Sequence, residues 1–371
     1  MGNQYEVVGT MSGTSLDGLD IVVSKFIQDQ ESGEWEGHIQ SFCSIAIPMS
    51  WQSRIRGLQT ALATDWHQAS VDWAAWCGDC IRESVDLAEV DLVVFSGQTV
   101  FHRPSLGWTG QLGNGATLYA GLNQQVPVVC DLRSLDVALG GQGAPLIPVV
   151  DALLFGKYEA CLNLGGFANV SSTSPEDGRR IAHDIGPCNL VLNHFAERVG
   201  KPYDTGGELA AQGSVQEELW RQWMALPYHQ QSPPKSLGTE WLEASFWPVL
   251  NAWEREHSSN IQDLLATTSA YIASLVRLSI NGKSTLITGG GAHNQSLVAA
   301  LMAPASKFIL GPEVKVIMAD QELTDGKEAH GFGFLGLLRA LGQDNVLESV
   351  TGSRSDHLGG ALWGSFDRRG T

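Results

Sequence analysis

Basic residues are scarce in this sequence, which has 23 Lys and Arg against 40 Asp and Glu and a formal net charge of −17. Nucleic acids and anionic membranes attract basic surfaces, so this charge balance argues against both as partners. A small anionic ligand is still compatible with it if the ligand binds where the protein is locally neutralised.

Long apolar runs are also lacking. Spanning a bilayer takes about 18–20 consecutive apolar residues, and no run approaches that length. The first six residues have neither the basic nor the apolar region of a signal peptide, so we expect a cytoplasmic protein. With 371 residues, 43% of them hydrophobic, the chain is long enough for two domains with separate cores.

Cysteines are few and scattered, and none of the ten histidines has the spacing of zinc ligands. Only Cys77 and Cys80 form a C-x-x-C pair, which can be a redox site. Together with Trp73, Trp76 and Ile81 they recur at helical spacing, so they share the apolar stripe of one helix instead of its N-terminus, where a thiolate would be stabilised. We predict that both cysteines pack in a core.

The Lys of a Walker A loop is missing from residues 9–20, GTMSGTSLDGLD, yet this stretch carries most of the groups that can hold a phosphate. It lies between two strand-like runs, and Asp17-Gly18 favours a turn, so we predict a β-hairpin. At a small, polar tip the backbone N–H groups can approach an anion, and the two acidic residues suggest a Mg²⁺ ion between them and the phosphates. An ordinary glycine-rich turn is the alternative. The candidate phosphate-binding residues are Gly13, Thr14, Ser15, Asp17, Gly18 and Asp20.

Two further strand-then-glycine segments occur at residues 160–170 and 285–294. A first phosphate hairpin, a second phosphate turn and a later triple-glycine turn, in this order, resemble the ATPase superfamily of actin, hexokinase and Hsp70. The resemblance implies an α/β, two-domain, ribonuclease H-like fold with a cleft between the domains, with the third segment facing the adenosine of ATP. The candidate ATP-binding residues in the two segments are Gly165, Gly166, Asn169, Gly289, Gly290, Gly291 and Asn294.

Apolar periodicity and punctuation by Gly and Pro predict the remaining elements. Helices are expected at residues 51–62, 67–87, 146–155, 187–200, 267–278 and 327–341, strands at 90–95 and 126–130, and a hairpin loop at 171–178. Gly140, Gly141 and Gly143 break the pattern and suit a crossing between domains. We therefore predict one domain from residues 1–138 and 343–371, and a second from 139–342.

Polar residues that follow buried strands point toward the ligand in an open α/β sheet. Gln98, Thr99 and His102 follow the strand at 90–95, and are candidates for substrate contact unless they only cap the turn. Arg133, after the strand at 126–130, could bind a carboxylate in bidentate fashion or form a plain surface salt bridge. Asp184 stands between a strand and a helix N-terminus, where it could serve as general base or cap the turn.

Six ordered motifs, spread over nearly the whole chain, carry a closer resemblance. They are residues 9–18 (GTMSGTSLDG), 97–102 (GQTVFH), 140–145 (GGQGAP), 184–187 (DIGP), 233–236 (PPKS) and 289–294 (GGGAHN). Together they resemble the 1,6-anhydro-N-acetylmuramic acid kinases of bacteria. Ile185 and Cys188 stand where that family more often has threonine and glycine, which affects only the local loop.

The resemblance implies an ATP- and Mg²⁺-dependent kinase that opens the anhydro ring of its amino sugar and phosphorylates the product during cell-wall recycling. It makes Asp184 the base that activates water, places Arg133 near the lactyl carboxylate, and puts Glu328 beside Asp17 in the metal site. It also adds Ser15 to the substrate contacts.

Two other functions stay open at this point. A nucleotide-dependent switch or scaffold would bind a protein partner, although the chain lacks a long appended β-domain or helical lid. A kinase for an ordinary hexose would transfer phosphate without opening an ether. Exposed tryptophans among the twelve could mark the interface of a homodimer.

Overall fold

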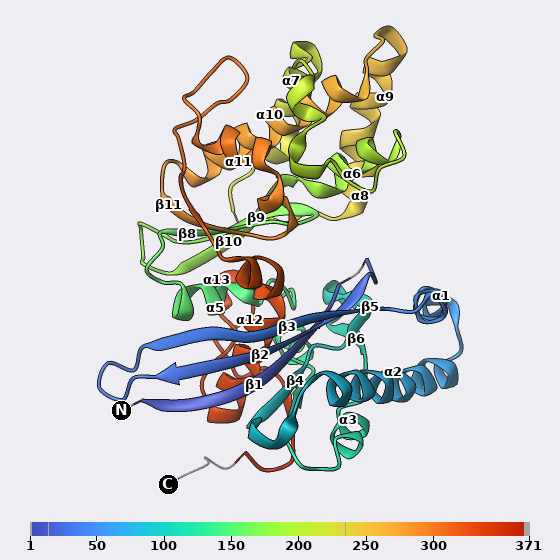
Figure 1. Cartoon of the computed structure of the whole chain (residues 1–371), viewed down its shortest axis with the longest axis vertical. Helices are drawn as coiled ribbons and strands as arrows, with labels where there is room; N and C mark the ends of the chain where they lie inside the picture. Colours follow the sequence, from blue (N-terminus) through green and yellow to red (C-terminus); the bar gives the residue numbers. More distant parts are fainter. Residues whose placement is uncertain (1, 14, 234, 367–371) are drawn as a thin grey trace. The chain divides into compact units, whose positions relative to one another are not determined.

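A computed structural model describes residues 2–13, 15–233 and 235–366. The chain forms two units (Figure 1): unit 1 runs to Phe155 and resumes at Gly326, and unit 2 is Gly156–Asp325. These bounds differ from the predicted ones at residues 138 and 342. The glycines at 140–143 lie inside unit 1, so they are not where the chain crosses between units.

A six-stranded sheet forms the centre of unit 1. β1 (Asn3–Ser12) and β2 (Gly18–Gln28) pair antiparallel, which confirms the predicted hairpin, and β3 (Trp35–Ala46) extends it. β4 (Leu92–Phe95) and β7 (Val128–Cys130) run parallel to β1, and β13 (Ala361–Trp363) covers the edge. The order is β13-β7-β4-β1-β2-β3.

Helices cover both faces of this sheet. One face packs against α2 (Ala63–Ser84) and α3 (Gly115–Gly121), and the other against α12 (Gln321–Leu341). The approach of α12 to β1 is very close, because a Cβ on Gly9 would lie 2.0 Å from the carbonyl oxygen of Ala329. Glycine at position 9 is therefore required by packing. The other helices of unit 1 are α1 (Met49–Gly57), α4 (Ser134–Ala138), α5 (Ile147–Leu154) and α13 (Glu348–Thr351), with short turns at Leu58–Thr60, Leu87–Glu89 and Pro104–Leu106.

The thiols of Cys77 and Cys80 lie on the buried face of α2, as predicted. Burial raises the pKa of Cys80 to about 11 and raises the pKa of Cys77 well above its ordinary value. Both groups are therefore thiols at neutral pH, and the core-packing interpretation is confirmed.

Unit 2 has a five-stranded sheet in the order β10-β9-β8-β11-β12. β8 (Ala160–Leu164), β9 (Phe167–Thr173) and β10 (Arg180–Pro187) are antiparallel neighbours, whereas β11 (Ser284–Thr288) and β12 (Lys315–Met318) run parallel to β8. This order and sense match β3-β2-β1-β4-β7 of unit 1. The predicted α/β fold of actin-like, ribonuclease H-like type is confirmed.

The core of unit 2 lies around α10 (Ile261–Ile280), and residues of five other α-helices contribute to it. These are α6 (Asn189–Glu197), α7 (Glu217–Met224), α8 (Thr239–Trp241), α9 (Trp247–Glu256) and α11 (Gln295–Met302), with short helical turns at Thr205–Gly207, Ala210–Gln212, Pro227–Gln230, Leu242–Phe246 and Gly290–His293. Aromatic rings fill this core; Trp223 stacks on Phe246 with ring centres 4.5 Å apart.

Three local predictions differ from the structure. Residues 98–103 form a strand, β5 (Gln98–Arg103), which pairs with β6 (Trp108–Leu112). Pro187 ends β10 instead of starting α6. The last long helix begins at Gln321, six residues before Lys327, because Asp320 caps it through the N–H of Leu323.

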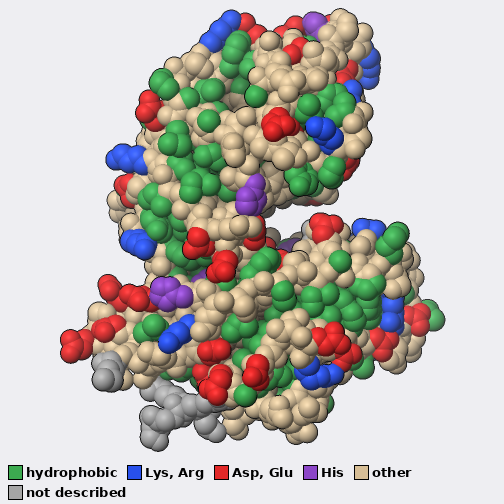
Figure 2. Space-filling view, in the orientation of Figure 1, with side chains coloured by type: hydrophobic (Ala, Val, Ile, Leu, Met, Phe, Trp, Pro, Cys, Tyr) green, Lys and Arg blue, Asp and Glu red, His purple; other side chains and the backbone are tan. Residues whose placement is uncertain are grey.

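No helix among the described residues is long and apolar enough to cross a membrane. On the face drawn in Figure 2, basic side chains stand singly and acidic ones gather over unit 1, in keeping with the net charge of −17.

A buried ion pair joins the two ends of unit 1 at which the chain leaves for unit 2. The Nζ of Lys327 lies 2.7 Å from Oδ1 of Asp151 and 5.3 Å from the ring centre of Phe155. Both charged side chains are less than 10% exposed, so their charges are weakly screened.

We expect Lys327→Met to lower the free energy of unfolding of unit 1 by about 3–5 kcal/mol, because Asp151 then stays buried without its cation. Chemical denaturation followed by circular dichroism measures this change. The double variant Lys327→Met, Asp151→Leu is expected to recover most of the loss. A loss below about 1 kcal/mol in the single variant would contradict a buried, energetically coupled pair.

Candidate functional site

The tip of the β1–β2 hairpin is fixed from both sides. Ser12 at the end of β1 donates a hydrogen bond from its hydroxyl to Oε1 of Gln98, and both side chains are buried. Leu16 closes the turn by donating its N–H to the carbonyl of Gly13 at 3.1 Å, with φ at +62°. Ser15 and Asp17 are exposed at this tip, and Thr14 lies outside the described residues.

Gly18 begins β2 opposite Ala46, and a Cβ there would lie 2.6 Å from Oγ of Ser44. Asp20 is two residues farther along β2, opposite Met11 of β1 and Ser44 of β3. The tip therefore presents the Ser15 hydroxyl and the Asp17 carboxylate, and a second carboxylate, that of Asp20, lies farther along β2.

Three charged groups of unit 1 interact electrostatically around α12. Desolvation raises the pKa of Glu328, the guanidinium of Arg133 opposes this rise, and the carboxylate of Asp20 adds to it. The pKa of Arg133 is lowered by desolvation, while Glu328 and Asp136 act in the opposite direction. Arg133, Glu328 and Asp20 thus belong to one charged cluster.

Arg133 is held at two points. Its Nη1 donates to the carbonyl of Gly143 at 2.7 Å, and its guanidinium carbon lies 5.3 Å from the ring centre of Phe332 on α12. The ring of His102 adjoins the same turn, because a Cβ on Gly143 would be 3.4 Å from His102 Cε1. The structure therefore brings His102 and Arg133 together around Gly143.

The β5–β6 hairpin fixes the other predicted substrate contacts. Thr99 donates its hydroxyl to Gln111 Oε1 at 2.9 Å, and His102 Nδ1 lies 3.2 Å from Thr109 Oγ1. Desolvation and then the nearby charge of Arg133 lower the pKa of His102, so its ring is neutral at pH 7. Gln98 lies at the Ser12 end of the same strand.

Asp184 lies in unit 2 on β10, opposite Asn169 of β9, immediately before a shift in register. Its Oδ2 accepts the N–H of Leu237 at 2.8 Å, its own N–H donates to the carbonyl of Lys235 at 3.2 Å, and its carbonyl accepts the hydroxyl of Tyr228 at 2.7 Å. Oδ1 accepts no hydrogen bond from any residue that the structure describes. Desolvation raises the pKa of Asp184, and the N–H of Leu237 acts against this rise.

The capping alternative for Asp184 does not match this geometry. α6 begins at Asn189, beyond the end of the strand, and the carboxylate of Asp184 binds a segment that lies far away in the sequence. That segment follows the predicted Pro-Pro-Lys-Ser motif. The side chain is thereby half-buried with one oxygen fixed and the other available.

The second and third glycine segments meet each other. A Cβ on Gly289 would lie 2.2 Å from Oδ1 of Asn163, and one on Gly291 would lie 2.7 Å from Cβ of Leu164. Asn189 fastens the junction by donating from Nδ2 to the carbonyl of Leu164 at 2.8 Å and from its N–H to the carbonyl of Gly165 at 3.1 Å. The turn at Gly290–His293 leaves its first N–H groups without helical partners, as any helix start does.

Polar residues form a row across the sheet from this junction to Asp184. Thr288 of β11 is opposite Asn163 of β8, which is opposite Asn169 of β9, which is opposite Asp184. Residues directly opposite each other on neighbouring strands share a face of the sheet. Thr288, Asn163, Asn169 and Asp184 therefore lie on one face of the sheet of unit 2.

Asn163 is a residue that sequence analysis missed. Its signal is an amide between two buried leucines, Leu162 and Leu164, on the strand that leads into Gly165. Asn294, in contrast, uses its side-chain oxygen to cap α11, where it accepts the N–H of Leu297 at 3.0 Å.

A family model described as anhydro-N-acetylmuramic acid kinase matches residues 5–365. The chain belongs to this family. A relative from Azorhizobium caulinodans is 36% identical, with 96% of this chain and 98% of the relative covered, and one from Rhizorhabdus wittichii is 32% identical, with 95% and 97% covered. Both carry the name anhydro-N-acetylmuramic acid kinase.

Membership confirms the resemblance found in the motifs, and it makes the chain a kinase that uses ATP. A relative from Burkholderia orbicola with the same name is 34% identical over 96% of this chain. An enzyme is thereby favoured over a nucleotide-dependent switch.

Gly289 provides a test of the junction, because its φ of +84° and the nearby Asn163 exclude a side chain. We expect Gly289→Ala to lower the Tm of unit 2 by roughly 5–10 °C. Gly290→Ala is the matched control: its Cβ would meet only Asn189 Nδ2 at 3.6 Å, and its Tm should stay within about 2 °C of the wild type. Equal shifts in differential scanning calorimetry would contradict the tight junction.

Proposed function

We propose that this chain hydrolytically opens the 1,6-anhydro ring of anhydro-N-acetylmuramic acid and phosphorylates O6, giving N-acetylmuramic acid 6-phosphate and ADP in cell-wall recycling. Family membership supports the kinase activity and the sugar. The observation that carries the chemistry is Asp184, with Oδ2 fixed by Leu237 and Oδ1 available to a water molecule.

The reaction needs one base and one acceptor of phosphate. Oδ1 of Asp184 takes a proton from water while the water oxygen bonds to the anomeric carbon, and the bond from that carbon to O6 breaks. O6 then attacks the γ-phosphorus of ATP, and the bond to the β-phosphate oxygen breaks to release ADP. The raised pKa of Asp184 strengthens it as a proton acceptor.

The remaining proposed roles are the binding of ATP and of the sugar. We propose that ATP is bound by Gly13, Thr14, Ser15, Asp17, Gly18 and Asp20 of unit 1, and by Gly165, Gly166, Asn169, Gly289, Gly290, Gly291 and Asn294 of unit 2. Small residues in these turns, and the N–H groups at the start of the turn at Gly290–His293, support this role. Ser15, Gln98, Thr99, His102 and Arg133 would contact the sugar, with Arg133 on its lactyl carboxylate.

Carboxylates near the hairpin suit Mg²⁺, which kinases hold through one or two carboxylates together with phosphates and water. Among the described residues no group of three or more His, Cys, Asp or Glu gathers at one point. We propose Asp17 and Glu328 as its protein ligands. When bound, the ion would neutralise charge on the transferred phosphoryl group.

We expect purified protein to release ADP only when the anhydro sugar is added. In ¹⁸O-labelled water, mass spectrometry should find label at the anomeric hydroxyl and none in the phosphate. The reaction is quenched early, and unlabelled product kept in the same water corrects for exchange. Absence of sugar-dependent ADP would rule out the kinase, and label in the phosphate would rule out attack by O6.

We expect Asp184→Asn to lower kcat by about 10²–10⁴, because the amide keeps the shape of the side chain and cannot accept the proton. Wild-type kcat/KM should fall as pH drops through the raised pKa of Asp184, and this limb should vanish in the variant. Tyr228→Phe, which removes only the bond to the Asp184 carbonyl, should change kcat less than about 10-fold. Near-normal turnover by Asp184→Asn would assign the base elsewhere.

A further inference from the structure

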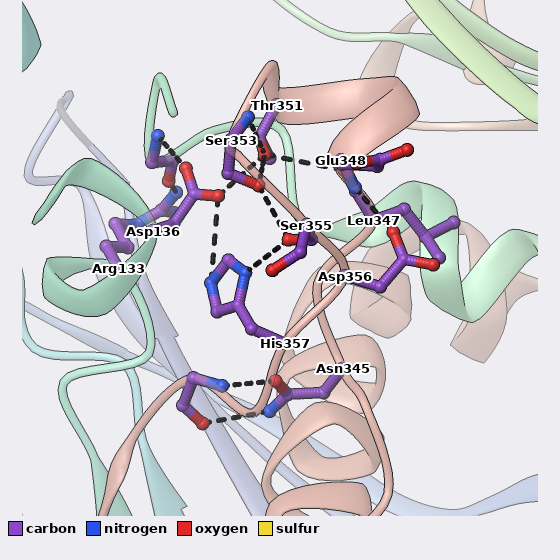
Figure 3. A network of polar contacts seen from close by, with 12 residues as sticks. Arg133, Asp136, Asn345, Leu347, Glu348, Thr351, Ser353, Ser355, Asp356 and His357 are labelled. Atoms are coloured by element: carbon purple, nitrogen blue, oxygen red, sulfur yellow. Dashed lines mark hydrogen bonds and ion pairs between the residues drawn. The ribbon is translucent and has the colours of Figure 1, made fainter. Parts of the chain in front are cut away.

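A buried carboxylate lies directly behind Arg133 (Figure 3). Asp136 on α4 is fully buried. Its Oδ2 accepts the N–H of Gly143 at 2.6 Å, and its Oδ1 accepts the hydroxyl of Thr351 at 2.6 Å. Nε2 of His357 lies 3.7 Å from the same Oδ1. Burying a carboxylate is costly, so three such partners indicate a site that is built around it.

The glycine turn at residues 141–143 wraps around Asp136. A Cβ on Gly141 would lie 2.3 Å from Oδ2 of Asp136, and the N–H of Gly141 donates to the carbonyl of Asp136 at 2.8 Å. The next residue, Gln142, donates its N–H to the carbonyl of Thr351 at 2.9 Å. Asp136 and α13 together therefore fix the path of this turn.

The C-terminal segment is anchored as firmly as the turn. Asn345 donates from Nδ2 to the carbonyls of Leu335 and Gly359 at 2.9 and 3.0 Å, and accepts the N–H of Gly359 at 2.7 Å. Figure 3 shows Asn345 below His357. These hydrogen bonds of Asn345 hold the C-terminal segment from which Thr351 contacts Asp136.

The glycine turn also holds Arg133, because the carbonyl of Gly143 accepts a hydrogen bond from Nη1 of the Arg133 guanidinium. Phe332 lies against the same guanidinium. This contact with Gly143 uses one of the five N–H donors of an arginine. The guanidinium is therefore oriented by a chain of contacts that begins at Thr351 and runs through Asp136 and Gly143.

We propose that Asp136 and Thr351 are positioning residues for the carboxylate subsite of the sugar: they set the Gly143 carbonyl, and through it the angle at which Arg133 meets the acid group of the substrate. This inference rests on the proposed function. Its ligand chemistry is a planar carboxylate, which a pre-oriented guanidinium binds through two parallel hydrogen bonds.

Steady-state kinetics of Thr351→Val and Thr351→Ser test the inference. Valine keeps the shape and loses the hydroxyl, so KM for the anhydro sugar should rise about 5–20-fold while kcat and KM for ATP change less than about 2-fold. Serine keeps the hydroxyl and should restore the wild-type KM. Thr268→Val is the matched control, because it removes a buried hydroxyl that donates to the carbonyl of Leu264 within α10, and it should leave KM for the sugar unchanged.

A double-variant cycle with Arg133→Met separates positioning from general loosening of the fold. Without the guanidinium, Thr351→Val should add less than about 2-fold to KM for the sugar. Equal effects of Thr351→Val in both backgrounds, or equal rises in KM for sugar and ATP, would overturn the inference while the kinase assignment stands. A wild-type protein without sugar-dependent ADP release would overturn the proposed function and this inference with it.

Discussion

The close contact between α12 and β1 is the constraint on which the site of unit 1 depends. Only glycine at position 9 lets the backbone of Ala329 approach the strand, and this contact sets the height and rotation of the helix over the sheet. Glu328 and Phe332, on the same stretch of helix, are thereby carried to Arg133. A methyl group at position 9 would push the helix away and separate all three.

In unit 2, the register of the strands positions the residues of the candidate site. Asn163, Asn169 and Asp184 share a face because their strands pair without a shift up to Asp184. The irregularity comes immediately after, between Asp184 and Gly186. A shift one residue earlier would have turned the carboxylate to the other face, since neighbouring residues of a strand point in opposite directions.

Sequence reasoning predicted the hairpin, which the structure confirms, and it singled out the glycine turns and Asp184 as candidates, because glycine spacing and strand ends are local signals. It could not find the partners of Asp184, since Leu237 and Tyr228 are brought there by tertiary folding. Asp136 was missed for the same reason: its partner Thr351 is 215 residues away in the sequence. The bounds of the units failed at residues 140–143, where glycines serve tight packing around a carboxylate and not a crossing.

The shared strand order has one more consequence. In each order the fourth strand, β4 or β11, is followed within two residues by a glycine in the left-handed region: Gly97 with φ at +69° and Gly289 with φ at +84°. These two glycines are counterparts, although their surroundings in the sequence differ. The two units therefore place a glycine with positive φ at the same point of a shared strand order, next to Gln98 in unit 1 and at the start of the triple glycine in unit 2.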